Sequence, residues 1–209
     1  NEVEWETFYA AAADWSIAGV SVHPGDAKDK MVNAALVAME INGMLPPDEI
    51  PAKTQGREGF FHLCDMSGDV SAAKLSYIIR DHDAEKFSQR KQTMREIERK
   101  INKTYGAGTA ALTLREQYRN MAEIIATCMH LIDNAKKACE NADVTPLVLP
   151  IRGGTDGCQL SFKGLPCPNL GTGGHAYHGP YEHITVEGMD IAVDVGLKII
   201  ELFYKYPFI

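Results

Sequence analysis

Cysteine is scarce in this sequence, and the cysteines present form no pattern that builds a disulfide framework or a metal site. Five of them are scattered irregularly over 209 residues, and no two form a CxxC pair. An odd number with this spacing is typical of free thiols in a reducing compartment. The GxSxG sequence that presents a serine nucleophile is also missing, which argues against a serine hydrolase of that type.

Positive charge and long apolar runs are lacking as well. Lysine and arginine number 21 against 28 aspartates and glutamates, a net charge of −7, whereas a nucleic-acid-binding protein normally needs a basic surface. No stretch approaches the ~20 apolar residues of a membrane span, and no basic segment followed by an apolar one indicates export. We therefore expect a cytoplasmic protein that has neither nucleic acid nor a membrane as its partner.

The remaining composition is that of a globular protein, with 45% hydrophobic and 23% charged residues. In the first 118 residues, apolar positions alternate between the period of a strand and that of a helix. The pattern predicts strands over 11–20, 60–70, 74–81 and 109–117. A helix is predicted over 31–45, and a second one after Asp83. This β-α-β-β-α-β order is the ferredoxin-like arrangement, in which two helices cover one face of a four-stranded antiparallel sheet.

The second of these helices carries the clearest local signals. Asp83 is a good N-cap, and Gly106 and Gly108 are expected to end the helix. One apolar stripe runs along an otherwise charged surface and consists of Phe87, Met94, Ile97 and Ile101. The stripe is expected to face the sheet.

The rest of the chain reads as the end of an α/β layer. We predict one long helix over 121–141, short strands over 144–151 and about 166–170, and a closing helix over 185–206. A glycine- and proline-rich stretch, 152–181, separates them. The residues of the last helix expected to face inward are Met189, Ala192, Val193, Gly196, Ile200 and Phe203. Two strands alone do not make a stable sheet, so this part lacks partners.

Two segments of the glycine-rich stretch are candidates for binding. Arg152 follows an apolar strand and precedes a glycine turn, where a guanidinium suits bidentate capture of a carboxylate, although a pair with a surface acid fits as well. The loop 169–174 contains Asn169, Thr172 and Gly173 and lacks the lysine of a phosphate-binding loop. Its backbone N–H groups could still hold an anion.

Histidines and one further arginine complete the candidates. His175, His178 and His183 lie within nine residues, but without the spacing of a complete zinc site they fit surface-loop histidines best. His23 precedes Pro24 and Gly25 and is either a rigidly presented donor or a turn residue. Arg80 ends a predicted strand, where it either holds a carboxylate or pairs with a neighbouring aspartate.

Several motifs, taken in their order and spacing, resemble one family. They are Val22-His23-Pro24-Gly25, Met31-Val32-Asn33-Ala34, Tyr77-Ile78-Ile79-Arg80-Asp81, Pro150-Ile151-Arg152-Gly153-Gly154-Thr155-Asp156-Gly157, Leu165-Pro166-Cys167-Pro168-Asn169-Leu170, Thr172-Gly173-Gly174, His178-Gly179 with Glu182, and Val186-Glu187-Gly188-Met189. The chain closely resembles the aminotripeptidases, or peptidase T family, of the M20 zinc metallopeptidases. The resemblance covers essentially all of its length.

The resemblance implies two domains. Residues 11–118 match the dimerisation, or lid, domain of that family. Residues 119–209 match the C-terminal part of the α/β catalytic domain. An α+β chain of this kind would form a homodimer through its lid domain and take short peptides as substrates.

The resemblance also assigns roles to single residues. His178 matches the last zinc ligand, and His23 matches the lid histidine that polarises the scissile carbonyl in the site of the partner subunit. Arg80 and Arg152 match residues that hold the substrate, in particular its C-terminal carboxylate. The positions of Asn169 and of Thr172 and Gly173 match the wall of the substrate pocket.

The family's other metal ligands and its general base lie before the point where this sequence starts. The resemblance therefore implies an enzyme with two zinc ions that removes the N-terminal residue from tripeptides, of which this chain supplies one ligand and is by itself inactive. Two alternatives stay open. The first is another M20 hydrolase, such as a carboxypeptidase or deacylase, and the second is a non-catalytic dimerisation module.

Overall fold

The computed structural model describes residues 1–205 and separates into two compact units. The first, which we call the inserted unit, is Phe8–Arg119. The second, which we call the two-segment unit, combines Asn1–Thr7 with the chain from Asn120 onward. None of the helices within residues 1–205 combines the length and the apolar composition needed to cross a membrane.

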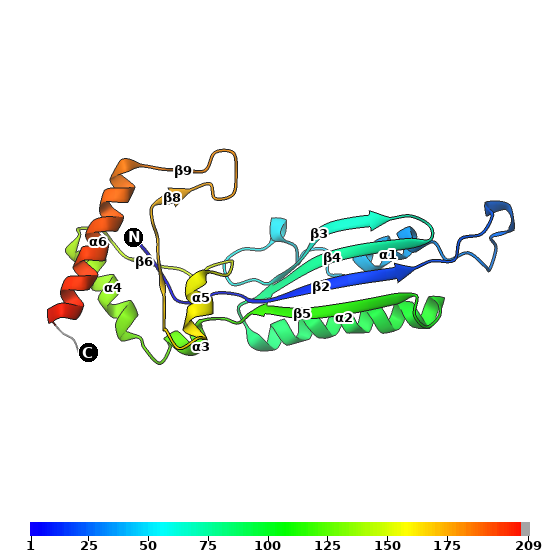
Figure 1. Cartoon of the computed structure of the whole chain (residues 1–209), viewed down its shortest axis with the longest axis horizontal. Coiled ribbons are helices and arrows are strands. Elements are labelled where there is room, and N and C mark those ends of the chain that lie inside the picture. Colours follow the sequence, from blue (N-terminus) through cyan, green and yellow to red (C-terminus); the bar gives the residue numbers. More distant parts are fainter. Residues whose placement is uncertain (206–209) are drawn as a thin grey trace. The chain divides into compact units, whose positions relative to one another are not determined.

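A four-stranded antiparallel sheet forms the inserted unit (Figure 1), in the order β3-β4-β2-β5. Its strands are β2 (Tyr9–Ala18), β3 (Phe60–Gly68), β4 (Ala72–Asp81) and β5 (Ala110–Tyr118). Its helices are α1 (Ala34–Gly43) and α2 (Ala84–Tyr105). The β-α-β-β-α-β order and the α+β class predicted from the sequence are confirmed.

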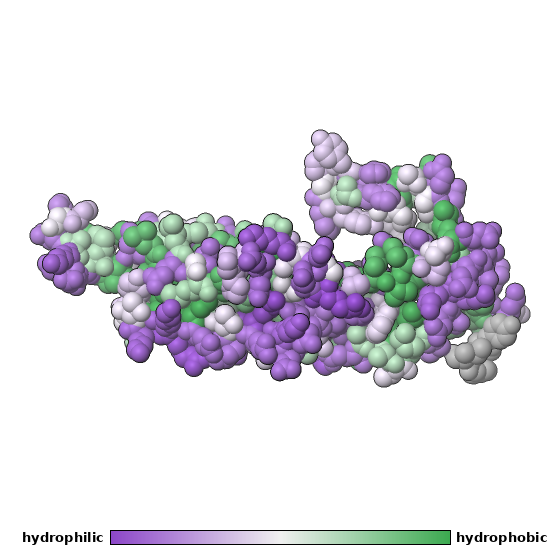
Figure 2. Space-filling model, turned by 180° about the vertical axis from the view of Figure 1, so that it is seen from behind, coloured by the Kyte–Doolittle hydropathy of each residue, from purple (hydrophilic) through white to green (hydrophobic). Residues whose placement is uncertain are grey.

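The core of the inserted unit lies between the sheet and the two helices. Alternate residues of β2 and β4, such as Trp15 and Ile79, pack against the helices. The buried residues of α2 are the four predicted ones, Phe87, Met94, Ile97 and Ile101. Polar side chains cover the outer side of α2, seen in purple along the lower edge of Figure 2. An apolar stripe on a charged helix therefore located this core correctly.

Local capping sets the ends of both helices. Asp83 caps α2 by accepting a hydrogen bond from Lys86 N at 2.9 Å, and Gly106 ends it with a φ of 110°, which favours glycine. The helix predicted over 31–45 is shorter and begins at Ala34, because Asn33 accepts hydrogen bonds from the backbone at Ala35 and Leu36.

The two-segment unit has smaller elements. A three-stranded sheet has the order β6-β1-β7, with β1 (Glu2–Glu4) at its centre, parallel to β6 (Leu147–Val148) and antiparallel to β7 (Asn169–Leu170). A two-stranded ribbon pairs β8 (Gly174–His175) with β9 (His183–Ile184). The helices are α3 (Ala122–Ile125), α4 (His130–Asn141), α5 (Asp156–Ser161) and α6 (Val186–Lys205).

The single helix predicted over 121–141 was wrong, because α3 and α4 are separate. Between them the backbone hydrogen bonds span three residues, from Thr127 N to Ile124 O and from Cys128 N to Ile125 O. The Thr127 hydroxyl also donates to Ile124 O at 2.8 Å, so it competes with the backbone for that carbonyl. The spacing of apolar residues along the sequence does not reveal such a break.

The prediction for the inward side of the last helix is right in part. Ala192, Gly196 and Phe203 are partly buried, and Phe203 packs against His130. Met189, Val193 and Ile200, which were expected to face inward, are exposed, and Val195 is buried. Apolar residues lie on nearly every side of α6, so the spacing of apolar residues fits two faces of the helix and does not determine which one is buried. The predicted end of this helix, Tyr206, lies outside the described residues.

A close backbone contact holds the base of the loop that follows β2. Gly19 donates from its N–H to Ser71 O at 2.8 Å, and a Cβ added at Gly19 would lie 2.1 Å from Val70 O. We expect Gly19→Ala to lower the free energy of unfolding by about 1–3 kcal/mol, because the backbone must move apart. Urea denaturation followed by circular dichroism measures this.

Gly43→Ala is the matched control. A Cβ at Gly43 meets nothing within 4 Å, and alanine favours a helix over glycine, so stability should stay equal or rise. Equal losses for the two variants would contradict the close contact at Gly19.

Candidate functional site

His23 stands on an exposed turn of the inserted unit. A short 3-10 turn, Pro24–Asp26, follows it, and His23 Nδ1 accepts a hydrogen bond from Gly25 N at 3.1 Å. A neutral imidazole that accepts at Nδ1 carries its proton on Nε2. The turn therefore presents an N–H donor to the surroundings, which is the form needed to polarise a carbonyl oxygen.

Arg80 lies near the end of β4 on the sheet face that the helices leave open. Its Nη1 donates to Ile79 O at 3.0 Å and to Ala11 O at 3.3 Å, and its guanidinium lies 5.3 Å from the centre of the Tyr118 ring. Burial lowers the pKa of Arg80 from its ordinary value, but a guanidinium stays charged in proteins. These contacts, with a side-chain hydrogen bond to Tyr118, orient a half-buried cation.

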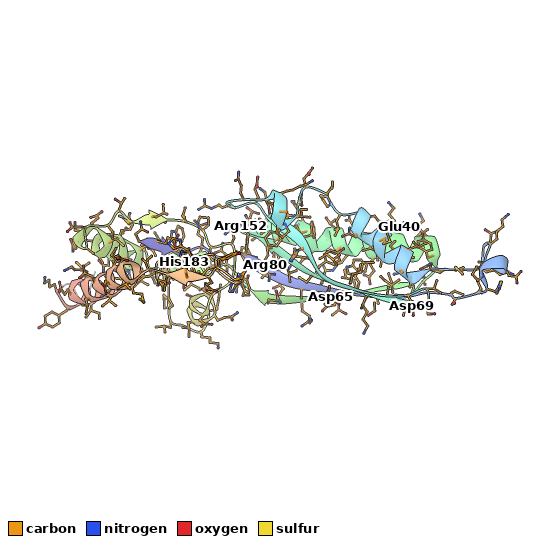
Figure 3. The ribbon with its side chains drawn as sticks, turned by 90° about the horizontal axis from the view of Figure 1, so that it is seen from above. Glu40, Asp65, Asp69, Arg80, Arg152 and His183 are labelled. Atoms are coloured by element: carbon orange, nitrogen blue, oxygen red, sulfur yellow. The ribbon has the colours of Figure 1, made fainter. Side chains whose placement is uncertain are left out.

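The alternative partners considered for Arg80 are engaged elsewhere. Asp81 accepts from Arg90 Nε at 2.8 Å, and Asp83 caps α2. Arg80 and Asp65, labelled in Figure 3, lie on the neighbouring strands β4 and β3. Neither Asp81 nor Asp83 therefore forms an ion pair with Arg80.

Arg152, half-buried, lies in the two-segment unit between β6 and α5 (Figure 3). The segment before it is fixed by a hydrogen bond from Ile151 N to Glu6 O at 2.8 Å. The segment after it is fixed by Thr155, which caps α5 by accepting from Cys158 N at 3.2 Å. Arg152 is thus carried on a loop whose two ends are anchored.

Asn169 helps to hold the end of this loop at Thr155. Its Nδ2 donates to Thr155 Oγ1 at 3.0 Å, and its Oδ1 lies so near Gly157 that a Cβ added there would be 2.6 Å away. Thr155 was missed by the sequence reading. A threonine before Asp156 and the turn of α5 is an N-cap signal that could have identified it.

Thr172 and Gly173 line a cavity of about 470 Å³, together with Asn1, His175 and Glu187 among others. Gly173 has a φ of +83°, and a Cβ added to it would come within 3.1 Å of Gly188 Cα. Glycine is required there both for the backbone conformation and for the close approach to α6. Arg152, Asn169 and His178 are not among the residues that line this cavity.

His178 lies in the exposed loop between β8 and β9. Its φ is 63°, an uncommon conformation for a residue with a side chain, and its backbone N donates to Glu182 Oε2 at 3.1 Å. His175 in β8 and His183 in β9 are paired across the ribbon, and their rings stack with centres 5.3 Å apart. Within residues 1–205, no three His, Cys, Asp or Glu side chains come together as a metal site.

Comparison with known proteins gives consistent matches along the chain. Residues 6–109 match the family model of the M20 peptidase dimerisation domain. Peptidase T of Clostridium perfringens is 51% identical over 203 residues, which are 97% of this chain and 50% of that protein. The chain thus spans about half the length of the curated relatives it matches.

Solved structures share the fold. The aminopeptidase PepT from Bacillus cereus superposes with a TM-score of 0.80 at 23% identity, over 96% of this chain and 53% of that one. A dinuclear metal-binding peptidase of the M20 family from Bacillus subtilis superposes with a TM-score of 0.65 at 14% identity, over 96% and 51%. The 51% identity along nearly the whole sequence and the match to the dimerisation-domain model show that the chain belongs to the M20 peptidase family.

Proposed function

We propose that this chain is the C-terminal half of an aminopeptidase with two zinc ions that removes the N-terminal residue from tripeptides. The observation that carries the proposal is the 51% identity to a peptidase T over 97% of the chain. A reducing, cytoplasmic location suits the five cysteines, which are all free.

His178 is the residue we assign to the metal. Imidazole is a common zinc ligand. Because His178 lies in an exposed loop, a metal ion held by residues outside the loop can reach it. The described residues form no group of three metal ligands. We therefore expect His178 to supply one ligand and the other half of the protein to supply the rest. Zinc, when bound, polarises a carbonyl and lowers the pKa of water.

Two arginines are assigned to the substrate. Arg80 is a half-buried cation held in place by Ile79 O and Ala11 O, and Arg152 lies on an anchored loop. Guanidinium groups bind carboxylates in two-point geometry, so the C-terminal carboxylate of a tripeptide is the group we expect them to hold. Thr172 and Gly173 would shape the pocket, and Asn169 would act by fixing the Arg152 loop.

In a homodimer that forms through the inserted unit, His23 of one subunit would reach the site of the other subunit. The unit matches a peptidase dimerisation domain. Its strand β3 lies at an edge of the sheet, and an edge strand favours pairing with another chain. On α1, Leu36 and Met39 are about 60% exposed, and on β3 Met66 is exposed as well. These features support an interface built from β3 and α1.

The activity itself gives the first test. The protein extended to the full length of its relatives, supplied with Zn²⁺, should hydrolyse free tripeptides, and removal of the metal by a chelator should abolish the reaction. The 209-residue chain with added Zn²⁺ should show no hydrolysis. N-acylated amino acids and dipeptides serve as control substrates. Preferred hydrolysis of acylated amino acids would replace the proposal with another M20 activity, and no hydrolysis of any of these substrates would favour a non-catalytic module.

The role of His23 can be tested by mixing subunits of the full-length protein. We expect His23→Ala to lower kcat by about 10²–10³-fold with zinc retained, because a donor to the reacting carbonyl is lost. His178→Ala should lose both zinc and activity. If His23 acts on the partner's site, mixed dimers of the two inactive variants contain one intact site and regain activity. Mixtures as inactive as their components would contradict a role across the interface.

Carboxylate capture predicts a particular kinetic change. Arg152→Ala in the full-length protein should raise KM by about tenfold or more, since a hydrogen bond to a charged group contributes about 1.5–3 kcal/mol. Tripeptides with an amidated C-terminus should show the same poor KM with the unchanged enzyme and no further loss with the variant. A variant that discriminates against the amide as strongly as the unchanged enzyme would show that Arg152 does not bind the carboxylate.

A further inference from the structure

Arg80 and Tyr118 lie on either side of Ala10 in one row across the sheet of the inserted unit. Arg80 on β4, labelled in Figure 3, and Tyr118 on β5 are both paired with Ala10 on the strand between them, β2. Residues directly opposite each other on antiparallel strands point to the same face of the sheet. The three side chains are therefore neighbours on the face that the helices leave open, although they come from three strands.

A β-bulge puts Tyr118 into this row. Ala11 is opposite Glu116. The next residue of β2, Ala10, is opposite Tyr118, so β5 has one residue more than β2 at this point. In regular pairing Gln117 would be opposite Ala10, and Tyr118 would point to the face covered by the helices. Bulges beside functional sites redirect side chains in this way, and this one places an aromatic ring on the open face.

Ala10 is small enough for the two larger side chains to meet across it. The guanidinium of Arg80 lies 5.3 Å from the centre of the Tyr118 ring, and the two side chains are also hydrogen-bonded. A guanidinium close to an aromatic ring is attracted by it. Ala10 is 0% exposed, so a larger side chain at this position would have to push its neighbours apart.

Tyr118 adds a third strand to the support of Arg80. The other contacts come from Ile79 O on β4 and Ala11 O on β2, both of which accept from Nη1. Arginine is a long side chain that loses much conformational entropy when it is held in one orientation. If the protein holds it before the substrate arrives, binding does not have to supply that cost. A carboxylate bound at two points also needs the guanidinium in a fixed plane.

We infer that Tyr118 is a positioning residue, which holds Arg80 in the orientation that binds the C-terminal carboxylate of the substrate. The inference rests on the proposed function, in which Arg80 binds that carboxylate. Because Tyr118 acts through Arg80, its loss should weaken substrate binding and leave the chemical step unchanged. A tyrosine with a purely structural role would not distinguish substrates that have the carboxylate from substrates that lack it.

Kinetics of the full-length protein separate these two roles. Tyr118→Phe keeps the ring and loses the hydroxyl, so it should raise KM for free tripeptides by about three- to tenfold with kcat nearly unchanged. Tyr118→Leu loses both contacts and should raise KM further. Neither variant should change KM for tripeptides with an amidated C-terminus. In a protein that already carries Arg80→Ala, Tyr118→Phe should cause no additional loss, because the two residues act as one unit.

Tyr105→Phe is the matched control. Tyr105 is another tyrosine of the inserted unit, and its hydroxyl donates to Glu40 Oε2 at 2.6 Å, so this variant also loses one side-chain hydrogen bond. It should leave KM unchanged for both substrates. The inference fails if the Tyr118 variants leave KM for free tripeptides unchanged, if they raise KM equally for free and amidated tripeptides, or if their effect adds in full to that of Arg80→Ala.

The NMR signal of the Arg80 Nε–H group gives a readout that does not need activity. In the full-length protein with isotope-labelled arginine, this signal is assigned by its absence from Arg80→Lys. A held guanidinium should give a separate signal that exchanges slowly with water, and Tyr118→Leu should shift it to the position of exposed arginines. An unchanged signal would overturn the inference. If the signal shifts as expected and no tripeptide is hydrolysed, positioning by Tyr118 is supported and the proposed function alone is contradicted.

Discussion

Two hydrogen bonds join the segment before the inserted unit to the segment after it, a third one holds the Asn120 side chain in place, and the rest of the arrangement depends on this cluster. Thr7 N donates to Asn120 Oδ1, Ala122 N donates to the same oxygen, and Met121 N donates to Thr7 Oγ1, all at 2.9–3.0 Å. Thr7 and Asn120 are almost fully buried, where an unmet polar group would be costly. The chain can therefore leave the two-segment unit and return to it at one place.

Because the chain leaves the two-segment unit and returns to it at one place, the topology of both units follows. Within the inserted unit, β2 and β5 are antiparallel neighbours, with Ala10 opposite Tyr118, so the chain enters and leaves at the same end of the sheet. Within the two-segment unit, the first residues can serve as the central strand β1 between strands that follow more than 140 residues later. The loops that carry Arg152 and Thr172 follow β6 and β7, the two strands that pair with β1.

The inserted unit could be predicted closely because its signals are local. In the two-segment unit the positions of β6, β7 and α6 were predicted, but the pairing of the strands with β1 was not. Long alternating strands and the cap at Asp83 each act within a few residues. The strands of the other unit have two or three residues and pair across the chain, so no window of sequence contains their partners. The site shows the same division. Arg80 and His23 could be selected by residue type, but the bond from Asn169 to Thr155 depends on contacts that only the fold creates.

Under the proposed function, this chain contributes His178 to a metal site whose other ligands lie elsewhere in the protein, so it should not hold two zinc ions alone. Calorimetric titration of Zn²⁺ into the metal-free 209-residue chain tests it most directly. The account predicts no tight binding of two ions, because a single imidazole from His178 is a weak ligand and no group of three ligands exists within residues 1–205. Tight binding of two zinc ions per chain, lost on His178→Ala, would contradict it.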